Sequence, residues 1–102
     1  MGFEILSDDE ESLSRALKNR AFIVDVRTVL EYRLDRMENT VNIPLNEIPG
    51  RIGELQDKAN IIVFCRSGSR SEQAKNYLLQ NGLENVLNGG NKSLIKRLLA
   101  SL

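Results

Sequence analysis

Cys65 is the residue whose chemistry stands out, because it is the one cysteine in a chain of 102 residues that contains no histidine. It follows the apolar run at residues 61–64, and a polar segment comes directly after it. That segment consists of Arg66, Ser67, Gly68, Ser69 and Arg70. A thiolate is a strong nucleophile, but without histidine no Cys–His pair can activate it. Any activation must therefore come from backbone N–H groups, hydroxyls or arginine charges.

The loop after Cys65 has the features that stabilise a sulfur anion. Its backbone N–H groups can form an anion-binding nest, and the N-terminus of the following helix adds partial positive charge. Arg70 adds a full charge, and Arg66 can add another or can be a solvated surface arginine. Gly68 permits a positive φ, and the two loop serines can donate further hydrogen bonds. We therefore expect the pKa of Cys65 to lie below the ~8.5 of a free thiol.

The rest of the composition excludes several classes of site. One cysteine cannot form an intramolecular disulfide, and the absence of histidine removes Cys/His zinc sites and Ser–His nucleophile pairs. We expect neither a metal nor a cofactor. A lone cysteine after an apolar strand is commonly a small core residue, but the basic and glycine-containing segment that follows argues against that interpretation of Cys65.

The elements that must position this loop alternate along the chain. Short apolar runs at residues 22–24, 41–43, 61–64 and 86–87 predict strands, and helical patterns lie between them. Such alternation indicates an α/β fold: a mostly parallel central sheet of about five short strands with helices on both faces. We expect one domain over residues 1–102.

Local signals set the expected element ends. Ser7 and Thr28 each stand three residues before a glutamate, so each predicts a helix-starting capping box. Gly82 predicts the end of the helix after the cysteine loop. Gly89-Gly90 predicts a plain turn. The last helix should present an apolar face, made of Leu94, Ile95, Leu98 and Leu99.

Charge and hydropathy patterns limit the classes of partner that the sequence favours. Lys plus Arg and Asp plus Glu balance at 14 each, so no global field attracts nucleic acid or an anionic membrane. No apolar run approaches the ~18 residues that a spanning helix needs. The acidic start of the chain is unlike a secretory signal. These features favour a cytoplasmic protein over a secreted one whose signal has been removed.

Four short motifs occur in order between about Phe22 and Gly90. They are Asp25-Val26-Arg27 with Glu31-Tyr32, then Val41-Asn42-Ile43-Pro44-Leu45, then Cys65-Arg66-Ser67-Gly68-Ser69-Arg70-Ser71, and finally Asn88-Gly89-Gly90. In this order and spacing the sequence resembles the rhodanese-homology family of single-domain sulfurtransferases.

The resemblance implies a chemistry for the loop. Cys65 would accept a sulfane sulfur from a small donor such as thiosulfate, a polysulfide or a persulfide, and pass it to a thiol or cyanide-like acceptor or to a partner protein. Backbone amides from Arg66 to Arg70 would hold the outer sulfur. The Arg70 side chain would brace the loop or meet an anionic donor. Asp25, Arg27 and Glu31 would be structural, and we interpret Arg27–Glu31 as an i,i+4 ion pair.

Two positions depart from the family pattern. Arg36 stands where histidine is usual, and Leu94 stands where an aromatic residue is common. Two other functions stay open. Related phosphatase and arsenate-type enzymes place five residues between cysteine and arginine, whereas four separate Cys65 from Arg70. A non-catalytic binding module is the stronger rival, although many such modules have lost the cysteine.

Overall fold

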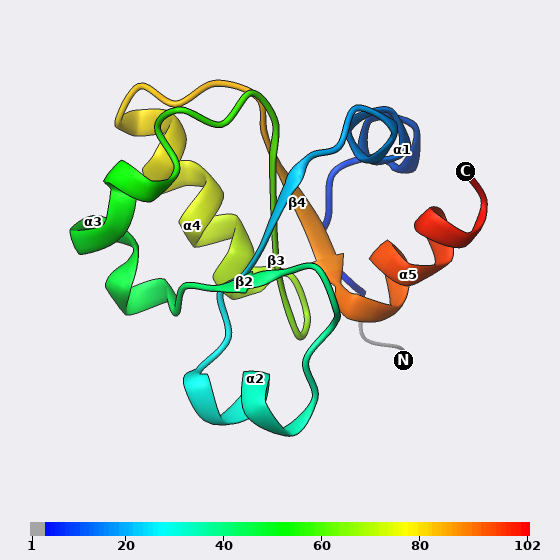
Figure 1. The fold of residues 1–102 in the computed structure, drawn as a ribbon, viewed down its shortest axis with the longest axis horizontal. Coiled ribbons are helices and arrows are strands. Elements are labelled where there is room, and N and C mark those ends of the chain that lie inside the picture. Colours follow the sequence, from blue (N-terminus) through cyan, green and yellow to red (C-terminus); the bar gives the residue numbers. More distant parts are fainter. Residues whose placement is uncertain (1–3) are drawn as a thin grey trace.

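A computed structural model describes residues 4–102 of the chain. Their strands form one parallel sheet in the order β2-β1-β3-β4 (Figure 1). The strands are β1 (Phe22–Asp25), β2 (Val41–Asn42), β3 (Ile61–Cys65) and β4 (Val86–Asn91). The expected α/β class and parallel sheet are confirmed, with four strands in the described residues rather than about five.

Helices lie on both faces of this sheet and at one end of it. The described helices are α1 (Glu10–Lys18), α2 (Val29–Leu34), α3 (Ile48–Arg51), α4 (Ser69–Gln80) and α5 (Lys92–Ala100), with 3₁₀ turns at Leu45–Glu47 and Ile52–Glu54. Figure 1 shows α1 and α5 on one face, α3 and α4 on the other, and α2 beyond one end of the strands. Among residues 4–102, no helix is long and apolar enough to cross a membrane.

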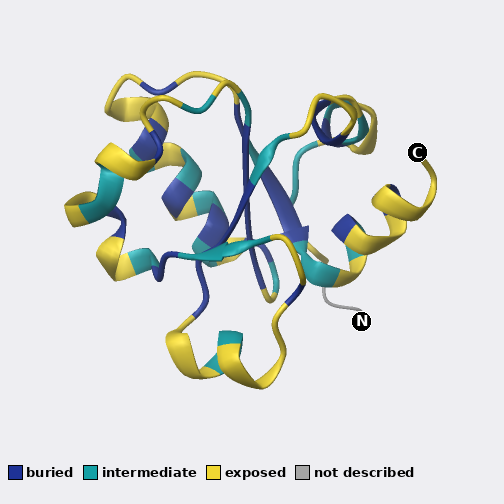
Figure 2. Cartoon of the chain, viewed as in Figure 1, coloured by how far each residue is buried: buried dark blue, intermediate teal, exposed yellow. Residues whose placement is uncertain are grey.

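The side-chain alternation of β3 divides the core into two clusters. Ile61, Val63 and Cys65 belong to the cluster under α3 and α4. Ile62 and Phe64 belong to the cluster under α1 and α5. Every residue of β3 is buried, and the strand is drawn dark blue in Figure 2. Burial on both faces explains why β3 is apolar without alternation. Cys65 consequently faces the side of the sheet on which α4 lies.

The start of the first helix differs from the expected capping box. Asp9, not Ser7, is the N-cap residue of α1, and its Oδ2 accepts a hydrogen bond from the Ser12 N–H at 2.9 Å. The reason is that Asp8 belongs to the sheet edge: its N–H donates to the Asn88 carbonyl at 2.8 Å. The segment before α1 therefore runs along β4 instead of starting the helix.

The double glycine also differs from expectation, because it lies inside β4 and not in a turn. The pairing of β4 with β3 shifts by one residue here, so that Val63 faces Asn88 but Phe64 faces Gly90. Gly90 has φ +77°, and a Cβ on Gly89 would lie 2.7 Å from Ile62 Cγ2. The glycines therefore form a bulge that lets α5 approach the sheet closely.

Other local predictions are confirmed. Thr28 and Glu31 form the capping box of α2. Gly82 follows α4 with φ +89°, and the hydrogen bond from the Leu83 N–H to the Leu78 carbonyl completes a Schellman ending. In α5, Ile95 and Leu98 are buried as expected, whereas Leu99 is 40% exposed.

Candidate active site

Cys65 occupies the carboxyl end of the central strand β3, where its Cα pairs with that of Asn91. The residue is only 2% exposed, but it opens into a cavity of about 290 Å³. The cavity is lined by Arg27, Asp35, Cys65, Arg66, Asn91, Lys92 and Ser93. Any donor must therefore approach the sulfur through this opening, which we call the cysteine cavity.

The loop turns its backbone toward the sulfur, as the sequence predicted. The Gly68 N–H donates a hydrogen bond to Sγ of Cys65 at 3.1 Å. Gly68 has φ +93°, and a Cβ at this position would come within 1.8 Å of the Leu6 carbonyl oxygen. The Leu6 N–H in turn donates to the Ser67 carbonyl at 2.9 Å. Only glycine fits at residue 68, because the N-terminal segment packs directly against it.

The hydroxyl closest to the sulfur belongs to Ser71, not to the loop serines. Its Oγ lies 3.4 Å from Sγ of Cys65 and 2.7 Å from Oδ1 of Asn88. Ser67 and Ser69 instead contact each other, Oγ to Oγ, at 3.2 Å and with solvent exposure. One hydroxyl carries one proton, so Ser71 can donate to the sulfur or to Asn88 at a given moment.

Asn88 connects the loop to β4 and was missed as a site residue. Its Nδ2 donates to the Gly68 carbonyl at 2.9 Å and to Glu72 Oε1 at 3.0 Å. Its Oδ1 accepts from the Gly90 N–H at 3.0 Å, within the bulge. Asn88 and Ser71 are each fully buried. The Asn88-Gly89-Gly90 motif is the sequence feature that could have indicated this role. The bulge at its glycines places the Asn88 side chain beneath the loop.

These contacts set the ionisation of the thiol. Burial by itself would raise the pKa of Cys65, because it disfavours the charged form. Hydrogen bonds from the Ser71 hydroxyl and from the backbone N–H groups of Ser71, Gly68 and Ser67 more than offset this effect. The pKa of Cys65 therefore lies below its ordinary value.

Arg70 is held by α2. Its Nη1 and Nη2 donate to the two carboxylate oxygens of Glu31 at 2.6 and 3.0 Å. The side-chain hydrogen bond to Arg70 is the main cause that lowers the pKa of Glu31 to about 2. The pKa of Arg70 is raised, first by Glu31 and in smaller part by the Cys65 thiolate. The guanidinium thus ties the start of α4 to α2 while its charge reaches the sulfur.

The expected Arg27–Glu31 pair is wrong. Arg27 lies before the N-cap of α2, outside the helix, so helical i,i+4 geometry does not apply to it. Its Nε and Nη2 instead donate to the two carboxylate oxygens of the fully buried Asp25, at 3.0 and 2.8 Å. Nη2 also donates to the Asp35 carbonyl at 2.7 Å. This pair fixes the chain on the α2 side of the cysteine cavity.

Arg66 differs from Arg70, because it is exposed and forms no ion pair with any residue of 4–102. It lines the cysteine cavity. No group of three or more His, Cys, Asp or Glu side chains in the described residues could hold a metal ion.

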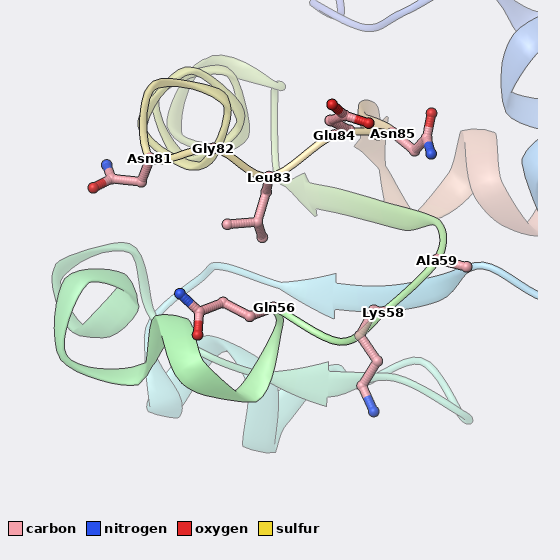
Figure 3. Close-up of a pocket in the computed structure, with 8 residues that line it drawn as sticks. All are labelled: Gln56, Lys58, Ala59, Asn81, Gly82, Leu83, Glu84 and Asn85. Carbon is pink, nitrogen blue, oxygen red and sulfur yellow. The ribbon is translucent and has the colours of Figure 1, made fainter.

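A larger cavity of about 460 Å³ lies at the opposite end of the strands (Figure 3). It is lined by the turn before β3 and the segment between α4 and β4: Gln56, Lys58, Ala59, Asn81, Gly82, Leu83, Glu84 and Asn85. Ligands of open parallel sheets bind at the carboxyl ends of the strands, and no cysteine, serine or threonine lines this cavity. It is therefore not the candidate active site.

The fold and the loop agree with a known class of domain. A sequence profile of the rhodanese-like domain matches residues 9–96. The chain therefore belongs to the rhodanese-like domain family.

Individual relatives agree with this assignment. A sulfurtransferase of Allochromatium vinosum is 38% identical over 82 residues, which span 78% of this chain and 77% of the relative. The putative sulfur carrier protein YrkF of Bacillus subtilis is 36% identical over 81 residues, 79% of this chain but 40% of YrkF. Among solved structures, a rhodanese-related protein from Thermoplasma volcanium superposes with a TM-score of 0.70 at 32% identity, over 89% of this chain and 91% of that one.

Proposed function

We propose that residues 1–102 form a single rhodanese-like domain that transfers sulfane sulfur through a persulfide on Cys65. The observation that carries the proposal is the position of Sγ at the end of β3, where it accepts a hydrogen bond from the Gly68 N–H and lies 3.4 Å from the Ser71 hydroxyl, which can donate a second. The names of the relatives, a sulfurtransferase and a putative sulfur carrier, support the same chemistry. No redox cofactor is required, because the transfer involves no net oxidation.

The first half-reaction charges the cysteine. The Cys65 thiolate attacks the outer sulfur of thiosulfate, a new S–S bond forms, and the bond to the sulfonate sulfur breaks. Sulfite leaves with that electron pair, and the negative charge now rests on the outer sulfur of the Cys65 persulfide. In this role the amides of residues 66–70 hold the outer sulfur.

The second half-reaction returns the enzyme to its starting state. A thiolate or cyanide attacks the outer sulfur, and the persulfide S–S bond breaks. Its electrons return to Sγ, so that the product leaves as a persulfide or thiocyanate. The groups that stabilise the Cys65 thiolate at the start also make it a good leaving group here.

Each arginine has a separate role in this proposal. Arg70 braces the loop, since both of its terminal nitrogens are occupied by Glu31. Arg66, which lines the cysteine cavity without a carboxylate partner among residues 4–102, attracts an anionic donor. A phosphatase mechanism is less well supported. It would need the two terminal nitrogens of Arg70 to bind the substrate oxyanion, and in this structure both of them bind Glu31 instead.

Steady-state turnover tests the proposal. Wild-type protein should convert thiosulfate or polysulfide with cyanide into thiocyanate, and with a small thiol into its persulfide. Cys65→Ser should lose this activity while its circular dichroism and unfolding midpoint stay close to the wild type. A folded wild-type protein that turns over none of these pairs would instead support a non-catalytic binding module.

A further inference from the structure

A second cavity adjoins the cysteine cavity. Its volume is about 460 Å³, and it is lined by Arg36, Met37, Glu38, Asn39, Lys92, Lys96 and Leu99. Lys92 lines both cavities. Asp35, on the wall of the cysteine cavity, precedes Arg36 in the chain. We call this second cavity the basic groove.

The groove contains positive charge that the protein leaves unpaired. Lys92 pairs with Asp35, whereas Arg36 and Lys96 form no ion pair with any residue of 4–102. Glu38 is the one acidic side chain in the lining. The pKa of Asp35 is lowered, first by the hydrogen bond from Lys92 and also by the charge of Lys96. The charge of Lys96 is thus felt at the wall of the cysteine cavity.

The cations form a row that leads away from the sulfur. Asn91 pairs with Cys65 across the sheet, and Lys92 follows it at the start of α5. Lys96 lies four residues later, on the same helix face and about 6 Å further along the axis. Leu99, which is 40% exposed, adds apolar surface that can contact methylene groups.

We propose that the basic groove binds the anionic distal end of a peptide-sized thiol persulfide whose outer sulfur is delivered to Cys65. Glutathione persulfide has the required chemistry: a carboxylate at each end of a chain of three residues, about 10 Å when extended. Thiosulfate carries its charge on the sulfonate bonded directly to the transferred sulfur, so it has no distal anionic end for the groove. This inference rests on the proposed function and assigns it a donor class.

The transfer balances without a further reagent. The Cys65 thiolate attacks the outer sulfur of the protonated persulfide, and the S–S bond of the donor breaks. The donor leaves as a thiolate with the electron pair of that bond, and the proton stays on the outer sulfur now bound to Cys65. Arg36 and Lys96 are positioning residues here, since they bind a part of the donor that does not react.

Kinetics with matched lysine variants test the groove. Lys96→Ala should raise KM for glutathione persulfide about fivefold, the factor for one solvent-exposed ion pair, with kcat unchanged. Adding Arg36→Ala should raise it again by a similar factor. KM for thiosulfate and for the neutral persulfide of N-acetylcysteamine should change by less than about twofold. The control is Lys18→Ala, which removes an exposed lysine from α1 and should affect no donor.

A binding measurement separates failure of the groove from failure of the proposed function. S-methylglutathione cannot react with Cys65, so it reports binding alone. It should shift the backbone amide resonances of residues 36–39 and 92–99 in the wild type and not in Arg36→Ala/Lys96→Ala. These shifts without turnover of any donor would overturn the sulfurtransferase function and leave the groove as a binding site. Turnover without these shifts, or equal KM increases for all three donors, would overturn the groove.

Discussion

The two sides of the Cys65 loop are built from different kinds of group. The inner side, formed by Gly68, Ser71 and Asn88, is buried and uncharged. The outer side, formed by Arg66, Lys92 and Asp35, is charged and reached by solvent. Within residues 4–102, no buried side-chain nitrogen or oxygen lacks a hydrogen-bond partner. The inner side is therefore a fully satisfied network, while the outer side keeps the free charge of Arg66.

This difference indicates a division of labour. Hydrogen bonds are strengthened in a dry, low-dielectric interior, so neutral donors there can stabilise a thiolate. Charges at the rim are screened beyond roughly 8 Å at physiological salt, but they attract anions to the opening. We infer that the inner side sets the ionisation of Cys65 and that the outer side sets which donors bind. Four substitutions test this division.

Removing Asn88 should have the largest effect. Asn88→Ala loses four hydrogen bonds, among them the side-chain acceptor of the buried Gly90 N–H. We expect a loss of about 3 kcal/mol in the free energy of unfolding, measured by urea denaturation. Asn81→Ala is the control, because Asn81 is exposed and should cost less than about 1 kcal/mol. Equal losses of unfolding free energy in the two variants would show that the hydrogen bonds of Asn88 stabilise the fold no more than those of an exposed asparagine.

Removing the Ser71 hydroxyl should affect the thiol more than the fold. Ser71→Ala deletes a donor to Sγ, so the pKa of Cys65 should rise and iodoacetamide alkylation near neutral pH should slow roughly tenfold. The matched control is Ser69→Ala, whose hydroxyl contacts only Ser67 among the described residues. Alkylation profiles against pH that coincide for wild type and Ser71→Ala would refute the role of Ser71.

Variants of Arg70 test whether its side chain holds the cysteine loop in place or binds an anionic sulfur donor. Arg70→Ala should lower kcat with thiosulfate and with a neutral polysulfane alike, because the loop loses its tie to Glu31. Arg70→Lys should rescue little, since lysine keeps the charge but not the two-nitrogen fork. Full rescue by lysine with both donors would contradict the brace.

The smallest effect concerns acid stability. The pKa of Glu31 is lowered from 4.5 to about 2, mainly by the hydrogen bond to Arg70. A lowered carboxyl pKa stabilises the fold above the unfolded value of 4.5, and this contribution is lost as pH falls through about 2. Wild type should exceed Glu31→Gln by about 1 kcal/mol in the free energy of unfolding at pH 6, and the gap should close toward pH 2. A gap that is independent of pH would argue against this ion pair.

The sequence predicted the parts of the site that depend on local pattern. The apolar run before Cys65 and the Gly68 that follows were enough to predict a strand, an inward-turned loop and a helix. Asn88 could not be assigned in this way, because its role depends on a one-residue shift in the pairing of β3 and β4.

Competition between local and distant partners explains the other differences. Ser7 has the spacing of a cap, but Asp8 binds Lys75 and the Asn88 N–H and so holds this segment on β4. Glu31 was expected to pair with Arg27, yet it binds Arg70, 39 residues away. Spacing rules for helices identify the neighbours a side chain can reach locally, and they do not include partners that the fold brings close.

Intact-mass spectrometry of the protein after incubation with thiosulfate, and separately with polysulfide, shows whether Cys65 carries sulfur. We expect the addition of one sulfur atom, located by peptide mapping on Cys65 and removed by cyanide or dithiothreitol. Cys65→Ser should gain no mass under the same conditions. An unchanged mass of the folded wild-type protein with every donor, or a sulfur located elsewhere than Cys65, would contradict the claim.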